Sequence, residues 1–333
     1  MRYLFVSEFG TFLGLSGKCL IVKHNDQIIR EIALSRLRSI CIVKKGISLS
    51  SDLVEACAIR GIKIFFLDWR GQTYSALIAK NQHAVVALRK AQFASIDDAN
   101  FCNTISKSLI TVKIKNQRAV LLYFCKYLNK LGNHNSDLIR KSADDLSSLI
   151  LKLKNITEPK DSNFRNYVLG IEGASANFYW NTLKNANLLA DDFIYREGRY
   201  ANSITNKALN YGYAILLSYV FSAVDNAGLE VYAGFLHTDR PGKPSLVLDL
   251  MEEYRAWVVD RNIIKLREKI ANARDFDFKL KKDIADAICK TMQTKYLYNR
   301  KKVKLENILQ RQIYRFSGSI SKKDLYKGYV FRW

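Results

Sequence analysis

The sequence predicts an α+β fold in which a small β-rich domain precedes a larger helical domain. Three observations support this prediction. The chain has 333 residues, more than one hydrophobic core usually serves. The first part alternates like β-structure, and from about residue 86 the apolar spacing becomes helical, with only 3 prolines in the whole chain. We place the domains at 1–85 and 86–333, with the joint between residues 80 and 95.

Short β-rich runs at hairpin spacing make up the first domain, at residues 2–9, 18–24, 27–34, 62–68 and 73–79. Glycines and the turn-like pair Asn25-Asp26 separate the early runs, and residues 69–72 lie between the last two as a second hairpin turn. One helix interrupts them, with Asp52 as its cap and Gly61 at its end. We therefore expect a β-sandwich-like domain with one helix.

Helical spacing dominates the second domain, in the sets Ile105, Leu109, Val112, Ala119, Tyr123 and Leu146, Ile150, Leu153. The apolar run 211–224 stops at Asp225 and is too short to span a bilayer, so we interpret it as a buried helix. Glu8 interrupts any apolar segment near the N-terminus, which argues against a signal peptide. The 6 cysteines show no metal-ligand spacing and are typical of reduced, buried thiols. We expect a cytoplasmic protein without a membrane segment.

A strong excess of positive charge indicates a polyanionic partner. Lys and Arg number 53 against 31 Asp and Glu, a net charge of +22. The C-terminal residues 290–333 are the most basic part, and the simplest partner is nucleic acid. Aromatic side chains alternate with these charges, so the tail either grips a DNA backbone or docks on the protein itself; they are Tyr296, Tyr298, Tyr314, Phe316, Tyr326, Tyr329 and Phe331.

The segment 166–180, NYVLGIEGASANFYW, places a carboxylate among unusually small residues. Glu172 lies between Gly170 and Gly173 inside a helix that should run to about residue 184. Each interior glycine costs about 1 kcal/mol relative to alanine, which is tolerated where another backbone or a ligand approaches. The alternative is an ordinary, solvent-exposed glutamate on a helix surface.

A second segment, 234–255, combines a histidine, a basic loop and an acidic helix. His237 follows an apolar run, the loop 238–244 carries Arg240 and Lys243, and a helix starts at Ser245. Three acids on this helix are spaced so that they lean to nearby faces; they are Asp249, Glu252 and Glu253. Taken alone, His237 could equally be structural and the acids a solvated face.

Together the two segments favour a metal site. An imidazole and two or more carboxylates suit Mg²⁺ or Mn²⁺ better than structural zinc. A cluster of acidic side chains is also unexpected in a strongly basic chain, and binding of a divalent ion would explain it. Such an ion can activate a hydroxyl and neutralise charge on a phosphoryl oxygen, which is phosphodiester chemistry.

The two segments resemble the CRISPR-associated integrase, the Cas one family. GIEGASANFYW matches the family's Gly-x-Glu-Gly-x-x-x-x-x-Tyr-Trp pattern, and LHTDRPGKPSLVLDLMEEYR with the following VVDR matches its histidine, basic loop and acidic helix. The resemblance covers nearly the whole chain.

The resemblance implies roles for individual residues. It makes Glu172 and His237 the first two metal ligands, and Glu252 the third, since the third family acid lies 13 to 15 positions after the histidine. Asp249 would support the site or replace Glu252 as the ligand, and this choice stays open. The resemblance also implies DNA contacts from the basic positions Arg240, Lys243 and Arg255.

The activity implied is insertion of short DNA fragments into a CRISPR array. The 3′-hydroxyls of a fragment attack phosphodiesters at the edges of a repeat, with Mg²⁺ or Mn²⁺ as cofactor. The family works as homodimers joined through the β-rich domain and bridged by a small CRISPR-associated partner protein, on double-stranded DNA. Two alternatives remain: a stand-alone nuclease for branched DNA, and a non-catalytic DNA-binding scaffold.

Overall fold

The structure, a computed structural model, describes residues 3–68, 73–77, 86–156, 164–198 and 200–332. The chain divides into two compact units, Met1–His83 and Ala84–Trp333. An N-terminal β-rich unit is followed by a mainly helical one, which confirms the predicted fold class.

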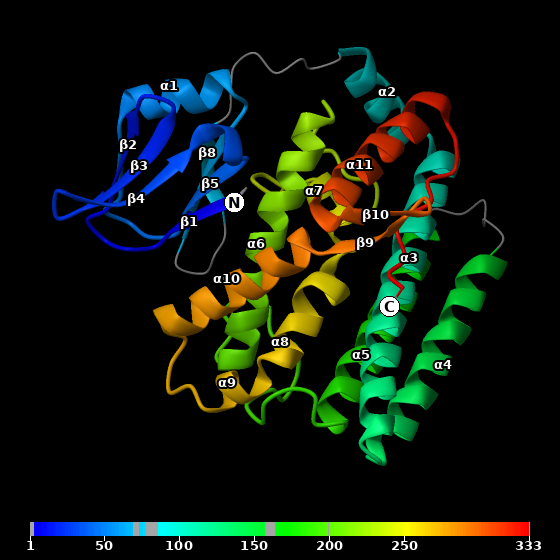
Figure 1. Ribbon diagram of the computed structural model, residues 1–333. Helices are drawn as coiled ribbons and strands as arrows, with labels where there is room; N and C mark the ends of the chain where they lie inside the picture. The colour runs from blue at the N-terminus through cyan, green and yellow to red at the C-terminus, as the bar shows by residue number, and fades with distance from the viewer. Residues whose placement is uncertain (1–2, 69–72, 78–85, 157–163, 199, 333) are drawn as a thin grey trace. The chain divides into compact units, whose positions relative to one another are not determined.

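Two four-stranded sheets form the smaller unit, in the orders β1-β5-β7-β8 and β4-β3-β2-β6 (Figure 1). The elements are β1 (Tyr3–Val6), β2 (Phe12–Ser16), β3 (Cys19–His24), β4 (Gln27–Ala33), a 3₁₀ turn (Leu34–Arg36), β5 (Ser39–Ile42), β6 (Ser48–Leu49), α1 (Ser51–Ile59), β7 (Lys63–Leu67) and β8 (Thr73–Leu77). Both sheets contribute apolar side chains to one buried cluster, among them Leu4, Leu13 and Ile64. This shared core explains the sandwich-like arrangement.

Two predicted hairpins are present, β3 with β4 and β7 with β8; residues 69–72 between the latter two lie outside the described part of the chain. β2, which pairs antiparallel with β3, was not among the predicted runs. β1, however, pairs in parallel with β5 rather than with its neighbour in the chain. The cap of α1 is Ser50, whose hydroxyl accepts a 3.2 Å bond from the Leu53 amide, so assigning that role to Asp52 was wrong.

The larger unit consists of helices and one two-stranded hairpin. Its elements are α2 (Val86–Asp97), α3 (Ala99–Lys130), α4 (Asn135–Asn155), α5 (Phe164–Asn185), α6 (Ile204–Asn226), α7 (Ser245–Met251), a π-helical segment (Ala256–Asp260), α8 (Arg261–Lys265), α9 (Arg267–Ala271), α10 (Phe278–Gln293), β9 (Lys295–Tyr298), β10 (Lys301–Lys304) and α11 (Leu305–Lys322). Helices α3, α4 and α5 pack against one another (Figure 1). The predicted periodic positions are buried, except for the half-buried Tyr123.

Helix α6 and the π-helical segment pack closely in the interior of this unit. A Cβ at Gly212 would lie 2.6 Å from Cγ1 of Val259, so a larger residue at 212 would push the two elements apart. Both Val258 and Val259 are fully buried. Helix α6 contains the apolar run 211–224, and no helix among the described residues is long and apolar enough to cross a membrane.

The basic C-terminal residues fold onto the helical unit. β9 and β10 form a hairpin whose loop residues Asn299 and Arg300 have φ of 48° and 65°, as a two-residue turn with positive φ requires. The chain then forms α11 and returns along α3. Phe331 stacks on Trp257 with ring centroids 5.0 Å apart.

The structure therefore favours docking for most of the tail aromatics. Tyr298, Phe316, Tyr326 and Phe331 are buried, while Tyr314 is exposed. Of the two alternatives, docking on the protein applies to the four buried rings, because protein already covers their faces. The second domain was expected to be helical throughout, and the β9–β10 hairpin corrects that expectation.

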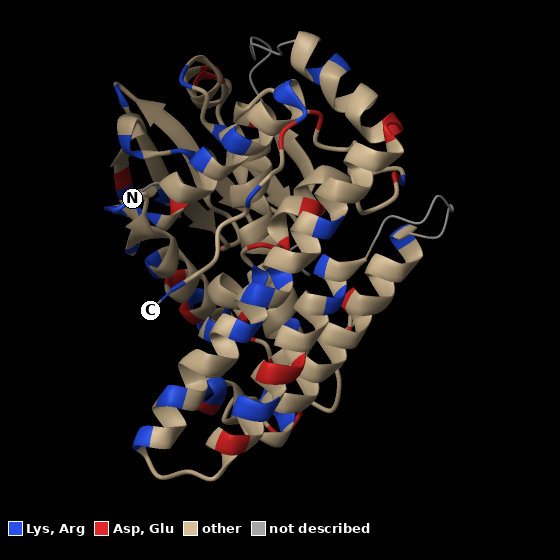
Figure 2. Cartoon of the chain, turned by 90° about the vertical axis from the view of Figure 1, so that its right-hand side faces the viewer, with Lys and Arg blue, Asp and Glu red and all other residues tan. Residues whose placement is uncertain are grey.

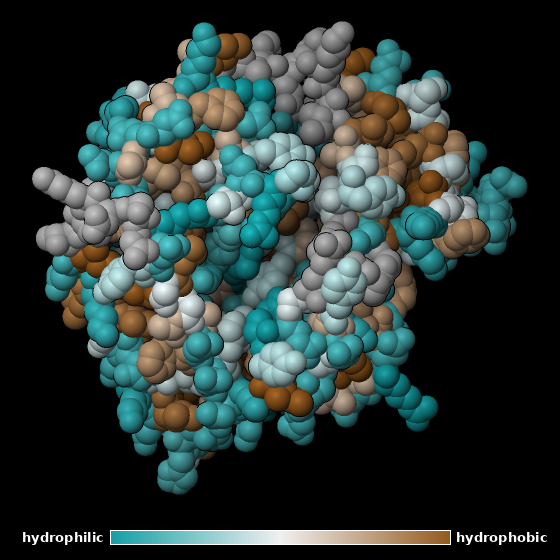
Figure 3. Space-filling model, turned by 180° about the vertical axis from the view of Figure 1, so that it is seen from behind, coloured by the Kyte–Doolittle hydropathy of each residue, from teal (hydrophilic) through white to brown (hydrophobic). Residues whose placement is uncertain are grey.

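Lysine and arginine are spread over many helices of the larger unit as well as the tail (Figure 2). On the face drawn in Figure 3, hydrophilic side chains surround separate apolar patches. All 6 cysteines are free thiols, of which Cys41, Cys57 and Cys125 are buried and the others half-buried.

Candidate active site

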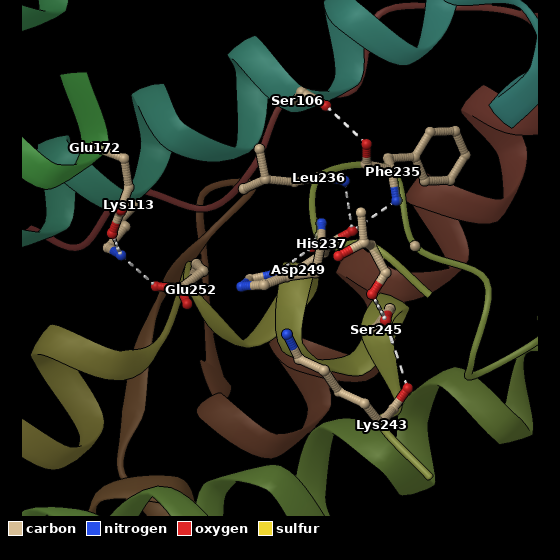
Figure 4. A network of polar contacts seen from close by, with 12 residues as sticks. Ser106, Lys113, Glu172, Phe235, Leu236, His237, Lys243, Ser245, Asp249 and Glu252 are labelled. Carbon is tan, nitrogen blue, oxygen red and sulfur yellow. Dashed lines mark hydrogen bonds and ion pairs between the residues drawn. The ribbon is translucent and has the colours of Figure 1, made fainter. Parts of the chain in front are cut away.

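One buried lysine joins two of the predicted site carboxylates. Lys113 lies on α3, Glu172 on α5, and Glu252 directly after α7, so three elements meet at this point. The Lys113 ammonium forms an ion pair with Glu172 and lies 2.8 Å from Oε2 of Glu252 (Figure 4). The site therefore brings Glu172 and Glu252 together as predicted, but around an ammonium group.

Glu252 is the most deeply buried of these charges, with its side chain 4% exposed. Burial would raise the pKa of Glu252, but the positive charges of Arg255 and Lys113 outweigh it and hold the pKa at about 2. Its Oε1 lies 3.2 Å from the Arg255 guanidinium. Among the described residues its Oε2 has the lysine charge nearby but no hydrogen-bond donor in proper alignment. This carboxylate is therefore ionised at neutral pH and retains an acceptor position.

Arg255 connects this pair to a second buried acid. Its guanidinium lies 5.1 Å from the Tyr213 ring centroid, and the Tyr213 hydroxyl donates a 2.5 Å bond to Asp260. Asp260 belongs to the π-helical segment, and such segments often occur at functional sites. The packing of Tyr213 thus fixes Arg255 beside Glu252 without a direct contact between the two acids.

Asp260 should make stability depend on pH. Burial raises its pKa from 3.8 to about 6, against the opposing effect of hydrogen bonds from Tyr213 and Tyr179. Between these two pH values the folded state holds a proton that the unfolded state has lost, so the free energy of unfolding falls as pH rises. Relative to Asp260→Asn, the wild type should lose about 2–3 kcal/mol between pH 4 and 7. Urea unfolding at several pH values would check this, and parallel profiles for the two proteins would contradict it.

Asp249 holds the loop that carries His237. Its Oδ2 accepts bonds from the amides of Phe235 (2.7 Å) and Leu236 (2.9 Å), and its Oδ1 accepts one from the amide of His237 (3.0 Å). The same Oδ1 lies 2.6 Å from Nδ1 of the His237 ring (Figure 4). All its acceptor positions are therefore used inside the protein.

This arrangement orients the histidine. When Nδ1–H donates to Asp249, Nε2 carries the lone pair and is the nitrogen available to a metal or a proton. Figure 4 shows the His237 ring directed toward Glu252. The loop carbonyls are fixed as well. The Ser106 hydroxyl donates a 3.2 Å hydrogen bond to the Phe235 carbonyl, and the Arg165 guanidinium donates one of 2.7 Å to the Leu236 carbonyl.

A glycine allows the loop to wrap this closely around Asp249. A Cβ at Gly234 would lie 2.8 Å from Cβ of Ser245 and 2.9 Å from Oδ2 of Asp249. No side chain fits there without displacing the carboxylate. Gly234 was not among the predicted site residues, although it lies in the same segment, shortly before His237.

The predicted basic loop is a tight turn. The Lys243 amide donates a 3.0 Å bond to the Arg240 carbonyl, across Pro241 and Gly242, and Gly242 has φ of 73°. Proline followed by a glycine with positive φ is the pattern of a type II turn. Arg240 is exposed and Lys243 half-buried, so both charges stand at the edge of the His237 loop.

The small residues of α5 leave open space. Among the described residues, a Cβ at Gly170 or Gly173 would meet nothing within 4 Å, so no described backbone packs against these glycines. Of the two explanations for the small residues, approach of a ligand remains as a prediction.

Glu253, the third acid of the predicted helix, points elsewhere, because it accepts bonds from the Tyr326 hydroxyl (2.7 Å) and the Tyr329 amide (2.8 Å).

The donor types at this site fit a divalent ion, although the side chains do not yet form a ligand shell. Two carboxylates and an imidazole nitrogen are the donors that Mg²⁺ or Mn²⁺ accepts. In the described ranges no three His, Cys, Asp or Glu side chains converge on one point. Lys113 lies between the carboxylates and was not among the predicted site residues, because no local motif marks a lysine on α3.

Two solved structures share the fold of this chain. One is described as "Casposase bound to integration product". The match covers 100% of this chain and 95% of that one, with a TM-score of 0.81 and 20% identity. A "Cas6-RT-Cas1--Cas2 complex" matches with a TM-score of 0.78 and 19% identity, over 99% of this chain and 36% of that one.

The chain belongs to the family described as "CRISPR associated protein Cas1", whose model matches residues 4–297. It is 48% identical to "CRISPR-associated endonuclease Cas1 1" of Francisella tularensis subsp. novicida (strain U112), over 100% of both chains. The family resemblance inferred from the two motifs is thereby confirmed.

Proposed function

We propose that this chain is a metal-dependent DNA integrase and endonuclease that inserts short DNA fragments into a CRISPR array. The observation that carries the proposal is the meeting of Glu172 and Glu252 on one cation, beside an oriented histidine. The name of the relative with 48% identity, an endonuclease, supports it, as does the integration product named with the casposase.

Three side chains would hold the metal in this proposal: Glu172, Glu252 and His237 through Nε2. Asp249 would not be a ligand in this proposal, because its oxygens already accept bonds from three backbone amides and contact the His237 ring. A bound Mg²⁺ or Mn²⁺ would lower the pKa of an attacking hydroxyl and neutralise charge on the phosphoryl oxygen.

The residues around the site would position DNA. Arg240 and Lys243 lie on the turn beside His237, where their charges can contact backbone phosphates. Arg255 is 28% exposed and keeps Glu252 ionised, so it can also face a phosphate while it holds the carboxylate. Phosphate contacts of this kind position a substrate without reading its sequence.

The partners belong to the same proposal. We assign double-stranded DNA as the substrate, in the form of an incoming fragment and a CRISPR repeat. The β-rich unit would join two copies of the chain, and a small CRISPR-associated protein would bridge two such dimers. The complex named with the second solved structure, which contains Cas2, supports such a partner. The place of action would be the cytoplasm.

A strand-transfer assay tests the proposal. The purified chain is incubated with a labelled DNA fragment and a supercoiled plasmid carrying a leader and repeat, with Mn²⁺, Mg²⁺ or chelator, and with or without the partner. We expect joined product only with a divalent ion. A fragment with 3′-dideoxy ends is the matched control and should give none, because it lacks the attacking hydroxyl.

Other outcomes would identify the alternatives. Cleavage of branched DNA without the partner, and without joining, would indicate a stand-alone nuclease. DNA binding that weakens with monovalent salt, ignores chelator and yields no product in any condition would indicate a scaffold. Either result would contradict the integrase.

A further inference from the structure

The cation between Glu172 and Glu252 belongs to the protein itself. We propose that Lys113 is a built-in occupant of the metal site, whose ammonium holds the two carboxylates together and must be displaced before a divalent ion can bind. This inference rests on the proposed function, since it concerns the same site.

The geometry makes Lys113 a substitute for the ion. Its side chain is 12% exposed and its ammonium contacts both carboxylates, which come from different helices. With Arg255 on the other oxygen of Glu252, two negative and two positive charges meet here.

This charge balance explains how the site is stable without metal. Two carboxylates facing one another would repel, and the buried charge of Glu252 would be strongly destabilising without a partner. The ammonium removes both penalties. The ammonium therefore holds the two carboxylates close together before any metal binds. A divalent ion can bind them only after it has displaced Lys113 from both.

The contacts suit a group that can leave. A lysine side chain is flexible and carries a point charge, whereas an arginine would hold the carboxylates in a rigid, forked geometry. Glu172 is 25% exposed, so the ammonium has a route outward on its side of the site.

Metal binding to Lys113→Met tests the inference. Methionine keeps the length of the side chain and removes the charge. We expect the Mn²⁺ dissociation constant, measured from the spin-resonance signal of free Mn²⁺, to fall about tenfold or more, because no charge-assisted bond must be broken. The melting temperature without metal should fall, and the rise on adding Mn²⁺ should exceed that of the wild type.

Two variants serve as controls. Lys113→Arg retains the charge and should bind Mn²⁺ no more tightly than the wild type. Lys115→Met, two positions along α3, removes a lysine for which the described residues show no carboxylate partner, and its Mn²⁺ affinity should be unchanged. Equal affinity of Lys113→Met and wild type would overturn the inference.

A measurement on the unaltered protein avoids dependence on the folding of a variant. Amine acylation followed by peptide mass spectrometry should label Lys113 slowly without metal and several-fold faster with Mn²⁺, relative to Lys115. Unchanged labelling of Lys113 at saturating Mn²⁺ would also overturn the inference. If the wild type, Lys113→Met and Lys113→Arg all bind no Mn²⁺, the metal site of the proposed function fails instead.

Discussion

Replacing Glu252 with glutamine is expected to abolish DNA strand joining while the protein stays folded. Glutamine preserves the shape and one carbonyl oxygen, but it removes the negative charge that lies 2.8 Å from Lys113 and 3.2 Å from Arg255. Because that charge would be a metal ligand, the rate should fall about a thousandfold or more. The rate is measured in single-turnover joining assays with Mn²⁺, and the Mn²⁺ dissociation constant is measured in parallel.

Glu172→Gln should behave in the same way, and Glu230→Gln is the matched control. Glu230 pairs with Arg89 at 3.7 Å and lies outside both site motifs, just before the segment 234–255, and its replacement should leave the rate within about twofold. If Glu252→Gln joins DNA at the wild-type rate and binds Mn²⁺ equally well, Glu252 is not a ligand. The third ligand would then have to be sought elsewhere.

Much of the fold could be predicted because apolar residues repeat with helical spacing over long segments. The heptad-like spacing along α3 and α4 extends over many turns, so the periodic signal outweighs local exceptions. β5, Ser39–Ile42, was not predicted as a strand, because four residues buried on both faces show no alternation. Its parallel pairing with β1 has no local signal at all, since the two strands are joined through other elements.

The C-terminal residues show where composition misleads. Basic residues alternating with aromatics suit both DNA contact and docking, and only packing separates the two. Phe331 stacks on Trp257, a residue from a distant helix, so the deciding partner could not be read from the tail. The β9–β10 turn was not predicted, although asparagine tolerates the positive φ that such a turn needs.

The candidate site residues that lie within sequence motifs could be predicted, whereas the one that reaches the site only through tertiary packing could not. Glu172, His237 and Glu252 stand within two recognisable segments. Lys113 is 59 residues from Glu172 in the chain and has no distinctive neighbours, so its role follows only from the packing of α3 against α5. The sequence also left open whether Asp249 or Glu252 is the ligand. The hydrogen bonds of Asp249 favour Glu252, and a second variant tests that choice.

Asp249→Ala is expected to destabilise the protein and disable the site together. The three amides of Phe235, Leu236 and His237 would lose their acceptor, at a cost of about 1–3 kcal/mol for each that stays buried. Thermal unfolding should show a melting temperature lower by about 10 °C or more. Asp239→Ala is the control, because Asp239 is an exposed acid of the same loop whose one contact, 3.5 Å from the Gly234 amide, is long.

The joining rate of Asp249→Ala, measured well below its melting temperature, should still fall about tenfold to a hundredfold, because His237 would lose the partner that fixes its tautomer and orientation. The two ligand assignments give different results in Asp249→Asn. If Asp249 supports the loop, this variant loses stability, since its amide group would face backbone donors, and its Mn²⁺ affinity falls only with the displaced histidine. An unchanged melting temperature combined with complete loss of Mn²⁺ binding would instead make Asp249 the ligand.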